Sequence, residues 1–274
     1  MTSLCCARTP QTSDGPNITA ENILVFTGAQ VALQTAAFAL AKDCHTIVFT
    51  PGYQSTIEAA AHAGGEVTRL ALTAANGWQV DVAAVAAAIR PDTRYLVLNE
   101  PYNPAGTLMS RAKQVELVAL ASQHGITVLC DEVYRLLEHD PEAHRLPAMC
   151  DAYHGGLSAA TLSKPWGAGG VAIGWLAFQD LKLRPRLVDV QYFSTACASR
   201  ASEVQALMVL RASEPILAKN RAIVRANLAL LDDFLATHAD LFSWVRPRAG
   251  AIGILECARH CCLYACHAMF FGLL

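Results

Sequence analysis

Short apolar runs with strand character alternate with amphipathic helical segments along most of this chain. The strand-like runs in this alternation lie at residues 23–27, 45–50, 66–70, 94–98 and 126–130. Alternation of this kind predicts an α/β fold with a mainly parallel sheet and crossover helices on both faces. Ligands of such sheets bind at the carboxyl ends of the strands, so polar residues that directly follow a strand are candidates for a site.

Two further strand-like runs, at residues 157–162 and 172–178, are joined by a glycine-rich turn. The turn is too short to hold a helix, so we expect these two strands to form an antiparallel hairpin. Beyond the hairpin, residues 200–211 and 215–238 have the periodicity of amphipathic helices. The second of these helices is long enough to connect the sheet to something smaller.

This organisation predicts one large domain followed by an incomplete small domain. The expected parts are a disordered amino terminus over residues 1–17, a large domain over 18–198, linker helices and the start of a small domain over 199–254, and an atypical Cys/His-rich tail over 255–274. After residue 253 the sequence shows no strand–helix pattern.

Composition and charge argue against several classes of protein. With 53% hydrophobic residues among 274, the chain can bury a sizeable core. Its formal net charge of −2 and its 16% of charged residues do not provide the basic stripe that nucleic acid requires. Residues 1–16 lack the apolar core of a signal peptide, and no uncharged run reaches the ~20 residues of a membrane helix. We therefore expect a soluble, cytoplasmic protein with neither nucleic acid nor membrane as a partner.

The ten cysteines do not predict a disulfide framework. Without a secretory signal, reduced thiols are the default, and Cys130 lies in an apolar run where a free thiol packs. In the tail, four cysteines stand near His260 and His267, but no pair has the C-x-x-C spacing typical of zinc sites. Residues 138–144 include acidic residues and two histidines, yet their charges and proline fit a solvated loop. We therefore predict no metal site.

Four polar residues at expected strand ends indicate a pyridoxal-phosphate site. Lys164, Asp131, Asn103 and Tyr134 each follow a strand-like run. Pyridoxal phosphate needs a lysine amine for its aldehyde, and a carboxylate beside its ring nitrogen because the protonated ring is the electron sink. It also needs hydrogen-bond donors to the ring hydroxyl. Lys164 can supply the amine and Asp131 the carboxylate, while Tyr134 and Asn103 can supply the donors.

The cofactor phosphate needs a cradle for its negative charge. The backbone N–H groups of Gly28, Ala29 and Gln30 at an expected helix start, together with the Thr161 hydroxyl, can provide this cradle. Tyr53 can stack on the ring face. Two simpler interpretations stay open: residues 28–30 can be only a turn between strand and helix, and Tyr53 can be ordinary packing.

Five motifs, in this order along the chain, carry a resemblance to a known family. They are Thr-Gly-Ala-Gln at 27–30, Pro-Gly-Tyr at 51–53, Glu-Pro-Tyr-Asn-Pro-Ala-Gly at 100–106, Asp-Glu-Val-Tyr at 131–134 and Ser-Lys-Pro-Trp-Gly at 163–167. With these motifs the chain resembles the large domain of the fold-type I, class I/II aminotransferases, the aspartate-aminotransferase-like superfamily. The similarity covers roughly residues 18–253.

The resemblance implies that Lys164, Asp131 and Tyr134 are catalytic. Lys164 would form a Schiff base with pyridoxal 5′-phosphate and move a proton between the substrate Cα and the cofactor C4′. Asp131 would pair with the pyridinium, and Asn103 with Tyr134 would hold the ring hydroxyl, while Tyr53 would take the stacking position. The implied reaction moves an amino group between an amino acid and a 2-oxo acid, in a homodimer.

The chain departs from the family pattern at three places. Ala172 stands eight residues after the lysine, where members of the family have an arginine that clamps the cofactor phosphate. The part before residue 23 is short, and the small domain that brings the substrate-binding arginine is incomplete, so we expect a chain truncated at both ends. One alternative is therefore a catalytically disabled protein of this fold with a binding or dimer-interfering role. Elimination or cyclisation by the same residues is another.

Overall fold

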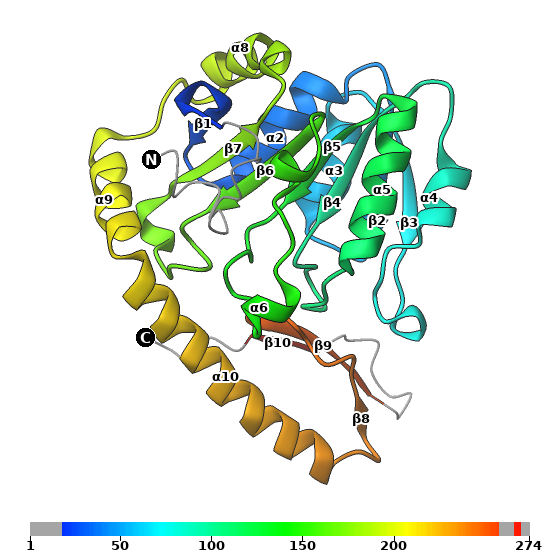
Figure 1. Ribbon diagram of the computed structural model, residues 1–274, viewed down its shortest axis with the longest axis vertical. Helices are drawn as coiled ribbons and strands as arrows, with labels where there is room; N and C mark the ends of the chain where they lie inside the picture. The colour runs from blue at the N-terminus through cyan, green and yellow to red at the C-terminus, as the bar shows by residue number, and fades with distance from the viewer. Residues whose placement is uncertain (1–17, 258–265, 270–274) are drawn as a thin grey trace.

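A seven-stranded sheet occupies the centre of the large domain (Figure 1). The computed structural model describes residues 18–257 and 266–269 of the chain. In order across the sheet, the strands are β1 (Ile23–Phe26), β7 (Gly174–Phe178), β6 (Gly156–Thr161), β5 (Thr127–Asp131), β4 (Thr93–Asn99), β2 (His45–Thr50) and β3 (Glu66–Ala71).

Most neighbouring strands of this sheet are parallel, as the alternating pattern predicts. The pairs β3–β2, β2–β4, β4–β5 and β5–β6 are parallel, whereas β7 runs antiparallel to both β6 and β1. The predicted hairpin is thereby confirmed, with Leu157 opposite Phe178. Its second strand begins at Gly174 rather than at residue 172, because Ala172 takes a left-handed conformation with φ of 52° in the connecting turn.

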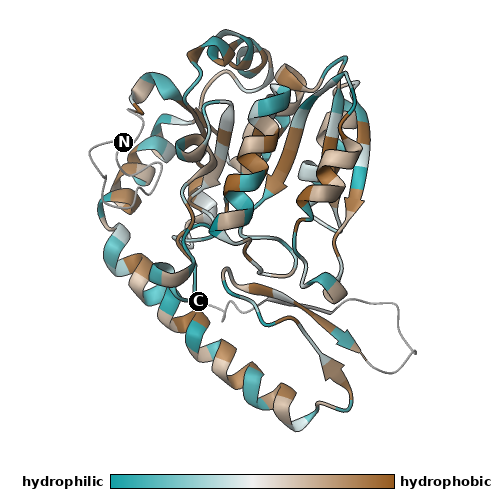
Figure 2. Cartoon of the chain, turned by 45° about the vertical axis from the view of Figure 1, so that its right-hand side comes forward, coloured by the Kyte–Doolittle hydropathy of each residue, from teal (hydrophilic) through white to brown (hydrophobic). Residues whose placement is uncertain are grey.

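Helices cover both faces of the sheet. They are α2 (Ala29–Leu40), α3 (Gln54–His62), α4 (Val82–Ala88), α5 (Arg111–His124), α6 (Pro141–His144), α7 (Met149–Ala152) and α8 (Arg184–Ser194), with 3₁₀ turns η1 (Ala20–Asn22), η2 (Ala74–Asn76), η3 (Gly169–Val171) and η4 (Leu181–Leu183). Tyr95 and Val97 of β4 pack with α2, while Leu96 and Leu98 pack with α4 and α5. Because both faces are buried at the centre of the sheet, strands β4 and β5 are apolar along most of their length, whereas the edge strand β3 is partly exposed (Figure 2).

Side-chain caps fix the helix boundaries that the sequence suggests. Asp81 accepts hydrogen bonds from the N–H groups of Ala83 and Ala84 at the start of α4. The Ser110 hydroxyl accepts from the N–H of Lys113 at the start of α5. Gly125 ends α5 with φ of 62°, a conformation that glycine adopts without strain.

Two helices lead from the large domain to a second, three-stranded sheet (Figure 1). They are α9 (Arg200–Arg211) and α10 (Ser213–Thr237), and the strands are β8 (Phe242–Ser243), β9 (Ile252–Cys257) and β10 (Cys266–Met269) in the order β10, β9, β8. The expectation of no strand pattern after residue 253 is wrong here. A short strand shows its pairing only when its partner is known, and Leu255 pairs with Cys266 across ten intervening residues that include undescribed ones.

Some expectations fall on residues outside the described part of the chain. They concern the amino-terminal 17 residues and, in the tail, His260, Cys261 and Cys262. Within residues 18–257 and 266–269, no helix combines the length and apolar character needed to cross a membrane.

Gly174 lets β6 and β7 approach the start of α2. A Cβ atom built on Gly174 would lie 2.5 Å from the backbone nitrogen of Ala29 and 2.6 Å from the carbonyl carbon of Gly28. It would also lie 2.9 Å from the carbonyl oxygen of Ala160. All three neighbours are backbone atoms, which cannot rotate away as a side chain can.

We predict that Gly174→Ala lowers the free energy of unfolding by about 1–3 kcal/mol, because the added methyl forces β7 and the start of α2 apart. Urea denaturation followed by circular dichroism measures this change. The matched control is Gly170→Ala, where a Cβ atom would meet nothing within 4 Å. Equal effects of the two substitutions would contradict the close approach described above.

Candidate active site

A cavity of about 350 Å³ opens at the carboxyl ends of β1, β2, β4, β5 and β6. Every site residue expected from the sequence lines it: Gly28, Ala29, Gln30, Tyr53, Asn103, Asp131, Tyr134, Thr161 and Lys164. These residues come from loops or strand ends more than one hundred positions apart in the chain. The sheet therefore brings the predicted set together at one edge, as expected for strands that share a direction.

Asp131, the last residue of β5, is a buried carboxylate in this cavity. Its side chain is 2% exposed, and its Oδ1 accepts a hydrogen bond of 3.2 Å from the Val133 N–H. Burial raises the pKa of Asp131 from 3.8 to about 7, while the Val133 bond and the charge of Lys164 lower it. A carboxylate that lacks hydration to this degree favours a cationic neighbour, and a protonated pyridine nitrogen is such a group.

Lys164 lies in the loop after β6 and faces the same cavity. Its Nζ is 5.9 Å from the centre of the Tyr134 ring, which is within cation–π range. The positive charge of Lys164 also lowers the pKa of Asp131, so the two side chains are close enough to interact electrostatically. The amine, the carboxylate and the phenol therefore form one group.

Tyr134 is held in its protonated form at neutral pH. Its side chain is 4% exposed, and burial together with the nearby charge of Asp131 raises its pKa to about 12. A neutral phenol keeps its O–H and can donate a hydrogen bond to an anionic oxygen. This is the role that the sequence motif assigns to it.

Asn99 braces two residues of the site. At the end of β4, its Oδ1 accepts a hydrogen bond of 2.6 Å from the Asn103 N–H, and its Nδ2 donates one of 2.8 Å to the Asp131 carbonyl. One buried amide thus joins the loop that carries Asn103 to the end of β5. Sequence reasoning missed Asn99, although its place directly before the Asn103 motif was a signal for it.

The start of α2 forms a cradle of backbone N–H groups. Gly28 precedes the helix with φ of 100° and ψ of 164°, a conformation that residues with a side chain rarely adopt. The first N–H groups of an α-helix have no partner within the helix, and they favour an anion. The conformation of Gly28 fits both interpretations of residues 28–30, a phosphate cradle and an ordinary turn.

Two hydroxyl residues lie on the lysine side of this cradle. Thr161 Oγ1 donates a hydrogen bond of 3.0 Å to the Ile173 carbonyl, so its proton points into the fold. Ser163 Oγ, 3.1 Å from Thr161 Oγ1, also lines the cavity. Sequence reasoning used Ser163 only as part of the lysine motif and did not assign it to the site.

Tyr53 lies at the rim of the cavity with 44% of its surface exposed. Its hydroxyl donates a hydrogen bond of 2.7 Å to Gln30 Oε1, which also accepts one from Ser55. The Tyr102 hydroxyl donates to the Pro51 carbonyl and so ties the turn before Tyr53 to the Asn103 loop. The bond to Gln30 ties Tyr53 to α2, and the bond from Tyr102 ties the preceding turn to the loop after β4.

Ala172 faces the cavity from the turn before β7. Among the described residues around the cavity, Lys164 carries the only positive side chain. A phosphate bound at the start of α2 would therefore be held by neutral donors. The carboxylate, amine, phenol and N–H cradle fit pyridoxal phosphate, and the charge that usually balances its phosphate is missing from this position.

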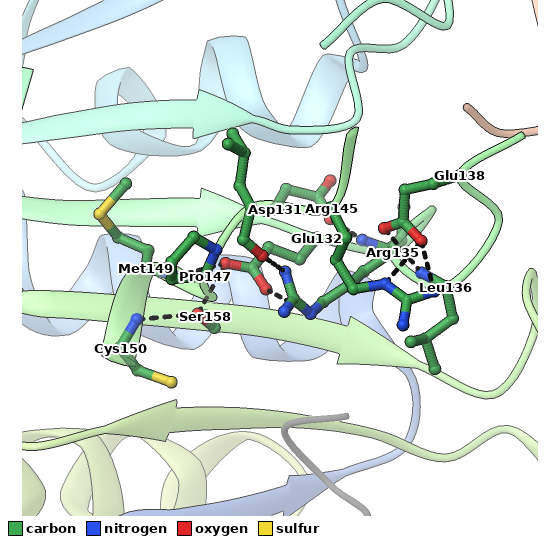
Figure 3. A network of polar contacts seen from close by, with 12 residues as sticks. Asp131, Glu132, Arg135, Leu136, Glu138, Arg145, Pro147, Met149, Cys150 and Ser158 are labelled. Carbon is green, nitrogen blue, oxygen red and sulfur yellow. Dashed lines mark hydrogen bonds and ion pairs between the residues drawn. The ribbon is translucent and has the colours of Figure 1, made fainter. Parts of the chain in front are cut away.

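A buried ionic network supports the loop that follows Asp131 (Figure 3). Glu132 Oε1 accepts hydrogen bonds from the Met149 N–H at 2.7 Å and from the Ser158 hydroxyl at 2.8 Å. Glu138 is 2% exposed and pairs with Arg145 at 2.8 Å. Glu138 is thus buried, with Arg145 and the Leu136 N–H in place of water, whereas Asp140, Glu142 and Ala143 are exposed as expected of a solvated loop.

Comparison with known proteins decides the family. A family model described as "Aminotransferase class I and II" matches residues 7–269. The chain belongs to this family. Kynurenine–oxoglutarate transaminase 1 of Rattus norvegicus is 34% identical over 58% of this chain and 40% of its own length. Aspartate aminotransferase of Musicola paradisiaca is 30% identical over 65% of this chain and 45% of its own length.

The solved structures of the aminotransferase family confirm the expected fold class. A PLP-dependent aminotransferase from Streptococcus suis superimposes with a TM-score of 0.84 and 30% identity. The match covers 89% of this chain and 64% of that structure. The mostly parallel sheet with helices on both faces is thus the fold of the PLP-dependent transferases. The chain spans less than half the length of the two curated relatives that it matches.

We predict that Asp131→Asn stabilises the protein without cofactor at pH 8 by about 1–4 kcal/mol. The folded-state pKa is raised, so ionisation of Asp131 opposes folding above pH 7, and this penalty disappears as the pH falls toward 3.8. Urea denaturation at pH 8 and pH 5 should therefore give a larger gain at pH 8. The exposed cap substitution Asp81→Asn is the control, and an equal gain in it would contradict the argument.

We predict that Asn99→Ala lowers the free energy of unfolding by about 1–3 kcal/mol, since it leaves the buried Asn103 N–H without its acceptor. The control is Asn76→Ala, because exposed Asn76 also accepts from one backbone N–H and donates to one carbonyl. Urea denaturation compares the two variants. A loss in Asn99→Ala no greater than that in Asn76→Ala would show that the brace is unimportant.

Proposed function

We propose that this chain is a pyridoxal-phosphate-dependent aminotransferase that moves an amino group between an amino acid and a 2-oxo acid. The single observation that carries the proposal is the pairing of Lys164 with a buried carboxylate, Asp131, in one cavity. Burial also raises the pKa of Glu100 and Glu132, but Asp131 is the one of these three carboxylates that lines the cavity with Lys164. A carboxylate in that position suits a protonated ring nitrogen.

Each predicted side chain has a role in this proposal. When bound, the cofactor supplies an electron sink for the carbanion formed at the substrate Cα. The Lys164 amine would bind the cofactor aldehyde and move the proton to and from the substrate Cα. Asp131 would keep the ring nitrogen protonated. Tyr134 and Asn103 would donate to the ring hydroxyl, and Tyr53 would pack against the ring.

The proposed phosphate cradle consists of neutral groups. The N–H groups of Gly28, Ala29 and Gln30 at the start of α2 bind the phosphate oxygens. Thr161 orients the lysine turn through its bond to Ile173, and it supports the cradle from the β6 side. The charge of the phosphate is then offset by the helix start rather than by a cation at position 172.

The names of similar proteins support the substrate class. The name of the Rattus norvegicus relative pairs an amino acid, kynurenine, with a 2-oxo acid, oxoglutarate. We propose the same two classes of substrate for this chain. The proposal further includes a homodimer, by analogy with the family, and a cytoplasmic location, which is consistent with the reduced thiols of Cys44 and Cys130.

A second candidate is a protein of this fold that binds the cofactor without turning over a substrate. Ala172 alone does not favour it, because other donors can hold the phosphate. The chain's coverage of only 40% and 45% of two relatives does favour it. Elimination and cyclisation are separate alternatives to amino-group transfer, and they use the same lysine and carboxylate. The two candidates differ in whether added amino acids change the bound cofactor.

Absorbance of the purified chain with pyridoxal phosphate tests the proposal. We expect a cofactor band that borohydride removes, leaving a modified peptide that contains Lys164. Lys164→Arg should abolish both signals, whereas Lys182→Arg, at an exposed position of η4, should preserve them.

Added amino acids should then shift the band and release a 2-oxo acid that mass spectrometry detects. A band that no amino acid shifts would support the second candidate and reject the transfer reaction. Absence of a band in the wild-type chain would reject both candidates.

A further inference from the structure

A segment returning from the small sheet contacts two loops of the site. We call residues 247–252 the return segment. The N–H groups of Arg248 and Ala249 both donate to the Gly106 carbonyl, at 2.8 and 3.0 Å. The Gly250 N–H donates to the Leu137 carbonyl at 2.9 Å. The return segment is thus bonded to the loop that carries Asn103 and to the loop that carries Tyr134.

His139 lies between the carbonyl groups of the return segment. Its Nε2 is 2.9 Å from the Gly250 oxygen, and its Nδ1 is 3.2 Å from the Pro247 oxygen. The backbone N–H of His139 donates to the Arg248 carbonyl at 2.8 Å. An imidazole donates through one nitrogen when neutral and through both when protonated, so at least one of these carbonyls is bonded by the ring in either state.

The same residue also joins the long helix to this contact. Arg225 of α10 donates through Nε to the His139 carbonyl at 3.1 Å. Glu138, next in the chain, forms a β-bridge with Ala249. Figure 1 shows the turn at α6, which follows His139 directly, lying next to β9. His139 is therefore the point where the post-β5 loop, α10 and the return segment meet.

The return segment in turn supports the ring of Tyr134. A Cβ atom on Gly250 would lie 3.2 Å from Cδ1 of that ring, which is tighter than most real contacts. Ile252 packs with Tyr134 and Leu137 in a small apolar cluster. A shift of the return segment by the width of one methyl group would therefore move the Tyr134 ring or leave it without support.

We propose that His139 is a positioning residue whose ring fastens the return segment to the site and so fixes the placement of Tyr134. The imidazole acts through hydrogen bonds to backbone carbonyls and touches no reacting atom. Its effect on the cofactor rests on the proposed function, whereas the fastening of the return segment does not.

Hydrogen exchange of the full chain, followed by mass spectrometry, tests the fastening directly. In His139→Phe we expect amides of residues 246–252 to exchange at least about threefold faster, the equivalent of one lost net hydrogen bond. Amides of β4 and β5 should be unchanged. His139→Gln, which retains amide donors at a similar reach, should restore most of the protection. His124→Phe, at an exposed position at the end of α5, is the matched control.

Each result decides the matter. Unchanged exchange in His139→Phe would overturn the proposal, because the ring would then act by bulk alone. Equal loss in the Phe and Gln variants would also overturn it, because retained amide donors would then give no protection. If His139→Phe does not fold, His139→Asn replaces it. Its amide is shorter, so protection should be lower than in His139→Gln, and equal protection would again overturn the proposal.

The cofactor provides an independent measurement. In the chain loaded with pyridoxal phosphate, the pH midpoint of the absorbance change should shift in His139→Phe. It should return to the wild-type value in His139→Gln, since Tyr134 would donate to the hydroxyl of the cofactor ring. A wild-type chain without any cofactor band would reject the proposed function and leave the exchange test in force. A normal band in the wild type with unchanged exchange in the variants would reject only the fastening.

Discussion

The burial of one carboxylate is the constraint on which the rest of the site depends. Asp131 is the last residue of β5, which lies between β4 and β6, and its side chain is buried away from water. Burial raises its pKa to about 7, so its ionisation is opposed. Neighbouring groups such as the Val133 N–H and Lys164 offset this only in part. In the proposed function, a protonated ring nitrogen would stabilise the ionised carboxylate further.

Parallel strands bring residues from distant sequence positions together around one cavity. Since β1, β2, β4, β5 and β6 share a direction, the loops after them meet at the same edge of the sheet. The antiparallel β7 has a different task. It returns the chain after Lys164, and the lack of a Cβ at Gly174 lets β7 pass close to the backbone at the start of α2. The hairpin that carries Lys164 and the start of α2 therefore meet through a contact between backbones.

Residues whose role follows from local chemistry could be predicted, and those defined by a distant partner could not. The strands were readable because both faces are buried, so Tyr95 to Leu98 form an unbroken apolar run. The lysine, carboxylate and phenol were readable because they follow strands. Asn99 and His139 look ordinary in sequence, since their importance lies in bonds to Asp131 and Gly250. The fully buried Glu138 looked solvated for the same reason, because Arg145 neutralises it only in the folded chain.

The long helix α10 connects the large sheet to the small one. Its 25 residues span ~38 Å at 1.5 Å per residue, so a tilt of about 5° would displace the far end by about 3 Å. At its near end, Ser213 Oγ accepts a bond from Trp166 Nε1 at 2.7 Å, and Asn220 donates to the Pro165 carbonyl at 2.8 Å. The near end of α10 is thus bonded to the two residues after Lys164, while the chain beyond its far end returns to pack against Tyr134. The small sheet is therefore connected to the loops of both Lys164 and Tyr134.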